Sequence, residues 1–150
     1  RCDRPEREFF FRALQRAALS APHLRPGNDR NVKSSPGQTY PAVQALGACD
    51  GVQRQPDEAV QHAQGFVQRR FGENWHDSAV ETYRGFRFVV AFENNVTAPG
   101  YVTEKLVNAM LAGAVPIYYG PRDAASMFHA GSYVDCGAFA TLDACADHVA

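Results

Sequence analysis

The chain has 150 residues, about the length of one domain. Its composition, 45% hydrophobic and 21% charged, is ordinary for a globular protein and argues against a disordered tail or a collagen-like chain. Its 15 Lys and Arg nearly balance 16 Asp and Glu, so the basic footprint of a nucleic-acid-binding protein is absent. No apolar stretch approaches the roughly 18 residues of a membrane span, and the best one is Phe88–Phe92.

The four cysteines, Cys2, Cys49, Cys136 and Cys145, are too scattered for a disulfide-rich miniprotein and lack the CxxC spacing of a zinc site. They allow three connectivities, of which a local Cys136–Cys145 bridge is one candidate in an oxidising compartment. We favour small free thiols, because free cysteine mostly behaves as a small hydrophobe. The five histidines have no metal-binding spacing either, so no metal is predicted.

The first half of the chain predicts two helices separated by a long loop. Glu6–Leu19 has the apolar spacing of a helix. The residues that recur at intervals of three and four are Phe10, Phe11, Leu14, Ala17 and Ala18. Ser20–Pro56 is rich in Pro and Gly and predicts an irregular loop, with a short helix near Ala42–Leu46. Helical periodicity returns over Asp57–Phe71.

The second half predicts a strand, a helix and a second strand. Phe86–Phe92 is aromatic and β-branched, which favours a strand buried on both faces. After a polar loop, Thr103 is a natural N-cap and Gly113 a natural stop for a helix. The apolar face of this helix comprises Val102, Leu106, Ala109 and Met110. Val115–Tyr119 is the second strand, so the segment forms a βαβ unit.

Two further elements follow, a weaker strand over Tyr133–Cys136 and a terminal helix capped by Thr141. A βαβ unit implies parallel strands. The fold class predicted from these patterns is therefore α/β, with a parallel sheet flanked by helices, in a single domain over residues 1–150; the family resemblance described below implies that this sheet is Rossmann-like.

Ligands bind beyond the carboxyl ends of parallel strands, which directs attention to Glu93–Val102 and the helix start that follows. Unpaired N–H groups at a helix N-terminus favour an anion such as phosphate, and Lys105 supplies a full positive charge there. Glu104 points about 100° away from Lys105 around the helix axis and is suited to accept hydrogen bonds from sugar hydroxyls. Asn94 and Tyr101 add orienting groups. From the residues alone, a solvated first turn and a packed Tyr101 are the alternatives.

The segment FRFVVAFENNVTAPGYVTEKLVNAMLAGAVPIYYG, Phe86–Gly120, resembles the signature region of the α1,3/α1,4-fucosyltransferases, glycosyltransferase family 10. The shared parts are an aromatic strand ending in FEN, a Y-[IV]-T-E-K helix start and an A-x-P strand ending in Gly. REFFFRAL, from Arg7, resembles another family segment. Six residues separate Asn94 from Tyr101, one more than in the usual family loop. The family's acidic, Gly-rich segment is not recognisable in Ser20–Gly51.

This resemblance implies a two-domain GT-B architecture in which the chain is the C-terminal, donor-binding half. It implies that Lys105 contacts the pyrophosphate of GDP-fucose, Glu104 the ribose hydroxyls and Arg7 the phosphates. Asn94 and Tyr101 would line the donor pocket. No cofactor or metal is required.

The implied reaction is the inverting transfer of L-fucose from GDP-fucose to an N-acetylglucosamine or glucose unit of a glycan, as in protein glycosylation. The resemblance assigns the general base to a carboxylate of an N-terminal, acceptor-side domain, so no catalytic residue is predicted here and the chain is expected to be an inactive fragment. Glu93 is expected to hold the loop. Eukaryotic relatives are Golgi type II membrane proteins, anchored through an N-terminal segment. A non-catalytic nucleotide-binding module and a transferase using another nucleotide sugar are the alternatives.

Overall fold

A computed structural model describes residues 5–20, 43, 48–49, 52–53 and 75–150 of the chain. Two compact units are distinguished, Arg1–Gln55 together with Phe139–Ala150, and Pro56–Ala138. Each unit is described by itself below. The helices predicted near Ala42–Leu46 and over Asp57–Phe71 lie outside the described residues, as does most of the predicted loop.

In the first unit, helix α1 (Pro5–Ser20) packs against helix α6 (Leu142–Val149). Both helices were predicted from the sequence, and both are confirmed. The buried face of α1 comprises Phe10, Phe11, Ala13 and Leu14. At the start of α6, the Thr141 hydroxyl accepts a hydrogen bond from the Ala144 N–H at 3.1 Å, as an N-cap residue should. An exposed Arg16–Asp143 ion pair of 2.9 Å joins the two helices.

The loop predicted over Ser20–Pro56 contains regular structure. Strands β1 (Ala48–Cys49) and β2 (Val52–Gln53) pair in antiparallel fashion. The prediction of an irregular loop is therefore wrong at these positions. A two-residue strand is too short to show the alternation by which strands are predicted from sequence.

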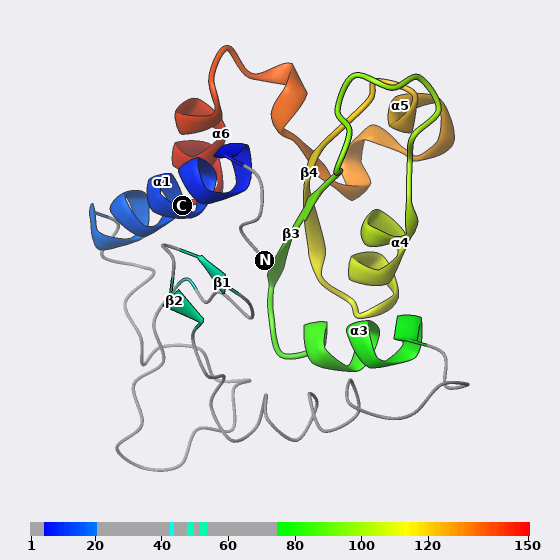
Figure 1. Cartoon of the computed structure of the whole chain (residues 1–150), viewed down its shortest axis with the longest axis horizontal. Coiled ribbons are helices and arrows are strands. Elements are labelled where there is room, and N and C mark those ends of the chain that lie inside the picture. Colours follow the sequence, from blue (N-terminus) through cyan, green and yellow to red (C-terminus); the bar gives the residue numbers. More distant parts are fainter. Residues whose placement is uncertain (1–4, 21–42, 44–47, 50–51, 54–74) are drawn as a thin grey trace. The chain divides into compact units, whose positions relative to one another are not determined.

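The second unit is built on a parallel sheet in the order β3-β4-β5. Its strands are β3 (Phe88–Phe92), β4 (Val115–Tyr119) and β5 (Val134–Asp135). Phe92 is aligned with Tyr119, so β3 and β4 end at the same edge of the sheet (Figure 1). The predicted parallel α/β fold is confirmed, although β5 is shorter than its predicted range.

Helix α4 (Glu104–Leu111) connects β3 to β4 and packs on both strands. Its residues Leu106 and Ala109 are fully buried, as the helical spacing predicted. Gly113 ends the helical region in a left-handed conformation, with φ of +77°, and its N–H donates to the carbonyl of Met110. The core around α4 also contains Ala91, Tyr118, Ala124 and Tyr133.

Strand β3 is not buried on both faces, and that prediction is wrong. Phe88 and Val90 are 38% and 43% exposed, whereas the alternating residues Val89 and Ala91 are buried. The reason is that, among the described elements, α4 packs on the face of β3 that carries Val89 and Ala91, whereas Phe88 and Val90 lie on the opposite face. Aromatic and β-branched composition indicates a strand but does not show whether one or both of its faces are covered.

Several short elements were not predicted. They are α3 (Trp75–Tyr83), α5 (Ala124–Met127) and the 3-10 turns η2 (Ala130–Ser132) and η3 (Cys136–Ala138). α5 and the two 3-10 turns contain too few apolar repeats to give a clear periodicity, and α3, although as long as α4 and α6, mixes polar and apolar residues without a clear apolar face. Within the described ranges, no helix is long and apolar enough to span a membrane.

Cys136 and Cys145 are both buried and both disulfide-bonded. The interpretation of these two residues as free thiols is therefore wrong. Sequence spacing could not decide the matter, because a buried thiol and a buried disulfide sulfur occupy equally apolar surroundings.

Candidate anion-binding site

The site begins where strand β3 ends. The Glu93 N–H donates to the Tyr119 carbonyl at 2.8 Å and extends the pairing with β4 by one residue. Glu93 thus lies at the carboxyl edge of the sheet, where ligands of parallel α/β proteins bind. Its side chain is completely buried, so the carboxylate needs partners to compensate for its lost hydration.

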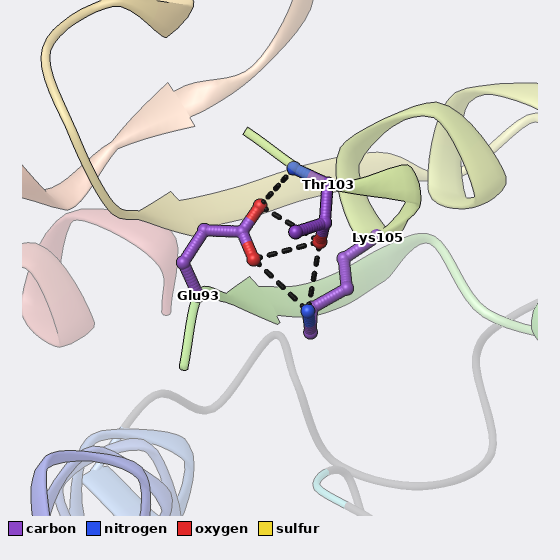
Figure 2. Close-up of polar contacts among 3 residues, drawn as sticks. All are labelled: Glu93, Thr103 and Lys105. Carbon is purple, nitrogen blue, oxygen red and sulfur yellow. Dashed lines mark hydrogen bonds and ion pairs between the residues drawn. The ribbon is translucent and has the colours of Figure 1, made fainter. Parts of the chain in front are cut away.

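Those partners are supplied by two residues at the start of α4 (Figure 2). Glu93 Oε1 accepts hydrogen bonds from the Thr103 N–H at 2.7 Å and the Thr103 hydroxyl at 3.0 Å. Glu93 Oε2 lies 2.7 Å from the same hydroxyl and 2.9 Å from Lys105 Nζ. The buried carboxylate therefore holds the end of the loop and the start of the helix together, and the expectation that Glu93 holds the loop is confirmed.

Thr103 is the N-cap residue of α4, as predicted, and its backbone is extended. Its side chain nevertheless makes no capping hydrogen bond to the helix. The hydroxyl instead donates to Glu93 and accepts a hydrogen bond of 2.8 Å from Lys105 Nζ. The first-turn N–H groups of α4 are consequently not capped by Thr103, and the positive end of the helix dipole is left for another acceptor.

Lys105 has a further hydrogen-bonding capacity. An ammonium group has three N–H donors, and the two contacts to Glu93 and Thr103 use two of them. The side chain is 26% exposed, so the third donor has access to solvent or a ligand. The group is both fixed in place and able to bind one more oxygen.

Glu104 lies in a different electrostatic environment from its neighbour. Burial, and then the negative charge of Glu104, raise the pKa of Tyr83 above its ordinary value of 10.0. Tyr83 belongs to α3, which packs on α4. The charge of Glu104 therefore acts on Tyr83 of α3, whereas Lys105 pairs with Glu93. This agrees with the rotation of about 100° between consecutive residues of a helix.

The loop between β3 and α4 is tied to the next loop of the sheet. The Gly100 N–H donates to Asp123 Oδ2 at 3.0 Å, and the left-handed φ of +72° at Gly100 is suited to glycine. The Tyr101 N–H donates to the Ala98 carbonyl at 3.1 Å, which closes a turn. Tyr101 is 37% exposed, and Asn94 is exposed beside Glu93.

Arg7 is the one predicted site residue that belongs to the first unit. It lies in the first two turns of α1 and is half-buried, whereas the other four predicted residues lie in the second unit. Its contact with a ligand stays a prediction. No group of three His, Cys, Asp or Glu side chains suited to a metal occurs in the described part of the chain.

Two residues beneath the site were not singled out from the sequence. A Cβ atom added to Gly120 would clash with the Tyr118 hydroxyl oxygen and lie 2.8 Å from Glu93 Cγ. Tyr118 is 1% exposed, and its hydroxyl has no hydrogen-bond partner among the described residues. Burial, and then the charge of Glu93, raise the pKa of Tyr118. Glycine at position 120 therefore provides the space into which Glu93 and Tyr118 pack.

The second unit is a parallel α/β domain with a polar loop and an uncapped helix start at the carboxyl edge of its sheet, which is where α/β proteins bind their ligands and where a helix favours an anion. Comparison with known families identifies the family within this class of α/β proteins. The model of glycosyltransferase family 10 (fucosyltransferase), C-terminal region, matches residues 38–150. The chain belongs to this family, which confirms the resemblance found in its motifs.

Individual relatives that are similar to the chain are also named fucosyltransferases. The chain is 34% identical over 64 residues to the alpha-(1,3)-fucosyltransferase FucT of Helicobacter pylori, covering 43% of this chain and 13% of the relative. It is 33% identical over 75 residues to the alpha-(1,4)-fucosyltransferase of Arabidopsis thaliana, covering 50% and 18%. It is 44% identical over 52 residues to human 4-galactosyl-N-acetylglucosaminide 3-alpha-L-fucosyltransferase 9, covering 34% and 14%. The aligned segments therefore span less than a fifth of each relative.

Proposed function

We propose that the chain is the donor-binding part of a fucosyltransferase and that its ligand is GDP-fucose. Membership of the fucosyltransferase family supports the reaction class. The observation that carries the proposal for this site is the Lys105 ammonium, held at the uncapped start of α4 with one N–H donor to spare. A helix N-terminus and an adjacent ammonium together provide what a diphosphate requires.

In the proposed complex, Lys105 contacts the pyrophosphate, Glu104 accepts hydrogen bonds from the ribose hydroxyls, and Asn94 and Tyr101 line the donor pocket. Arg7 is proposed to reach the phosphates. As fucose leaves with inversion, negative charge grows on the departing GDP. Lys105 and the N-terminus of α4 would stabilise that charge in the transition state by the same principle as an oxyanion hole. No metal is required in this scheme.

The general base that accepts the proton of the glycan hydroxyl is a separate requirement. Glu93 is unsuited to this role, because both of its oxygens accept hydrogen bonds and its side chain is completely buried. We therefore propose that the base belongs to an acceptor-side domain of a GT-B enzyme. That domain would also choose the acceptor, an N-acetylglucosamine or glucose unit, and the linkage.

Titration calorimetry of the chain with GDP, UDP and CMP tests the proposal. GDP is expected to bind most tightly, and Lys105→Ala should weaken it by about tenfold to a hundredfold, the usual effect of losing a charged hydrogen bond. Arg84→Ala is the matched control, because Arg84 also pairs with a glutamate, Glu81, at 3.1 Å but on the exposed surface. Folded chain that does not bind GDP would contradict the proposal.

Other outcomes separate the alternatives. Tighter binding of UDP or CMP would indicate a different nucleotide sugar. A longer protein containing this chain that binds GDP but transfers no fucose to any member of an acceptor array would indicate a non-catalytic nucleotide-binding module.

We also propose that, in a eukaryote, the protein functions in the Golgi as a type II membrane protein. The disulfides at Cys136 and Cys145 support an oxidising compartment. Imaging of the tagged full-length protein together with a Golgi marker tests this, and a uniform cytosolic signal would contradict it.

A further inference from the structure

We propose that Glu93 and Thr103 are positioning residues that make Lys105 a ligand for one oxygen of the donor diphosphate, in one fixed direction. The inference rests on the proposed function, since it assumes that Lys105 meets the diphosphate. It goes beyond that function because it assigns the orientation of the Lys105 ammonium to Glu93 and Thr103, which need not contact the ligand themselves.

The first argument is the geometry of the three side chains (Figure 2). Lys105 Nζ lies 2.9 Å from Glu93 Oε2 and 2.8 Å from Thr103 Oγ1, while Glu93 and Thr103 are joined at 2.7 Å. These three contacts form a closed triangle. A tetrahedral ammonium with two donors committed to a triangle has its third donor direction determined.

The second argument concerns freedom lost on binding. A free lysine side chain is flexible, and ordering it when a ligand binds lowers the affinity. Lys105 is already held by two contacts, and Glu93, which holds it, is itself completely buried. The ordering has therefore taken place during folding, and GDP meets a preorganised donor.

The third argument concerns charge. Glu93 and Lys105 form an ion pair, so the pair adds no net charge to the site. Lys105 then acts through a directed hydrogen bond more than through long-range attraction. Glu93 also accepts the Thr103 N–H, at the N-cap of α4, so one carboxylate aligns the ammonium with the helix N-terminus.

A double-mutant cycle on GDP affinity, measured by calorimetry on the whole chain, tests the proposal. Lys105→Ala should weaken binding by about tenfold to a hundredfold in the wild-type background, but by less than about threefold in a Glu93→Gln background. Comparing the two backgrounds cancels any effect of Glu93→Gln on GDP that does not pass through Lys105. The Thr103→Val background, in which the carboxylate is kept, controls for the negative charge that Lys105→Ala leaves unpaired. An equal or larger effect of Lys105→Ala in Glu93→Gln would overturn the proposal.

Two further variants separate a positioning effect on Lys105 from a general effect of the substitutions on folding. Thr103→Val leaves the carboxylate in place and should shrink the effect of Lys105→Ala in the same way. Glu81→Gln is the matched control for Glu93→Gln, since Glu81 is an exposed partner of Arg84. In the Glu81→Gln background, Lys105→Ala should retain its full effect.

A ligand-free measurement separates this inference from the proposed function. In NMR spectra selective for lysine ammonium groups, the Lys105 signal should be slow to exchange in the wild type and averaged with solvent in Glu93→Gln. Slow exchange without GDP binding would overturn the proposed function while leaving the fixed ammonium intact. Rapid exchange in the folded wild type would overturn the positioning role, whether or not GDP binds.

Discussion

Two helices of this chain begin at a threonine, and the two hydroxyls are used differently. Thr141 has an extended backbone, and its hydroxyl accepts a hydrogen bond from the third residue beyond it in α6. Thr103 also has an extended backbone at the start of α4, but its hydroxyl bonds to Glu93 and Lys105 instead. An acidic residue occupies the first turn of both helices, Asp143 in α6 and Glu104 in α4.

The difference shows how the same local signal can serve stability at one place and a binding site at another. The start of α6 satisfies its own N–H groups, as a structural helix does. The start of α4 uses its capping residue to compensate a buried carboxylate, and its own first turn is left to another acceptor. A helix that gives up its side-chain cap in this way is less stable by itself but ready for an anion.

The largest expected effect comes from adding a methyl group at Gly120, next to the Glu93 side chain that binds the start of α4. The start of α6 is not changed by this substitution. Gly120→Ala would place a Cβ against the Tyr118 hydroxyl and Glu93 Cγ. We expect a loss of about 2 kcal/mol in the free energy of unfolding, measured by urea denaturation, together with weaker GDP binding. Gly85→Ala is the matched control, because a Cβ there would meet nothing within 4 Å.

A second substitution checks the cause of that loss. Combining Gly120→Ala with Tyr118→Phe removes the oxygen that a Cβ would approach most closely, and should restore part of the stability. A double variant that is as unstable as Gly120→Ala alone would show that the Tyr118 hydroxyl is not the obstacle.

A smaller effect is expected from removing each threonine hydroxyl in turn. Thr141→Val should lower the free energy of unfolding by about 1 kcal/mol and leave GDP affinity unchanged. Thr103→Val should also lower stability by about 1 kcal/mol, since the Glu93 carboxylate loses the Thr103 hydroxyl as a hydrogen-bond donor, but should in addition weaken GDP binding about tenfold. Urea denaturation and calorimetry on both variants measure the two quantities. Equal GDP affinities in the two variants would remove the distinction between the helix starts.

The smallest effect is expected at Tyr118. Because its buried hydroxyl has no hydrogen-bond partner in the described part of the chain, Tyr118→Phe should leave the free energy of unfolding at pH 7 unchanged or raise it by up to about 1 kcal/mol. Burial and the nearby charge of Glu93 raise the pKa of Tyr118 above its ordinary 10.0. Above pH 10 the unfolded chain therefore loses this proton first, and stability falls as pH rises.

Urea denaturation from pH 7 to 11 checks both parts of this prediction. Tyr118→Phe should show a shallower alkaline decline than the wild type. A loss of more than about 1 kcal/mol at pH 7 would mean that the hydroxyl has a partner whose loss is costly.

Much of the second unit was predictable because its signals are local. The helix over Glu104–Leu111 follows from apolar spacing between a threonine and a glycine, and the parallel strands follow from the connection through that helix. The exposure of Phe88 and Val90 was not predictable, since it depends on what packs on that face of the sheet and not on β3 itself. Helix α3 is one residue longer than α4, but its sequence, WHDSAVETY, mixes polar and apolar residues without a clear apolar face.

For the site, the residue types were predictable and their connections were not. Motif and helix position indicated Lys105 and Glu104 from the sequence. The sequence does not reveal that the Thr103 hydroxyl bonds to Glu93, ten residues away, rather than to its own helix. The packing of Gly120 against Tyr118 and Glu93 is a contact between two loops and a strand, which no spacing rule describes.

The hydrogen bond between Gly100 and Asp123 has a consequence for how the length of the β3–α4 loop can vary. Glu93 holds one end of the β3–α4 loop through Thr103, and Asp123 holds the loop again at Gly100. Residues between these anchors can change in number at little entropic penalty, because closing a slightly longer loop costs only a few tenths of a kcal/mol. We therefore expect that residues 95–99 are the place where the length of this loop can be engineered without moving Lys105.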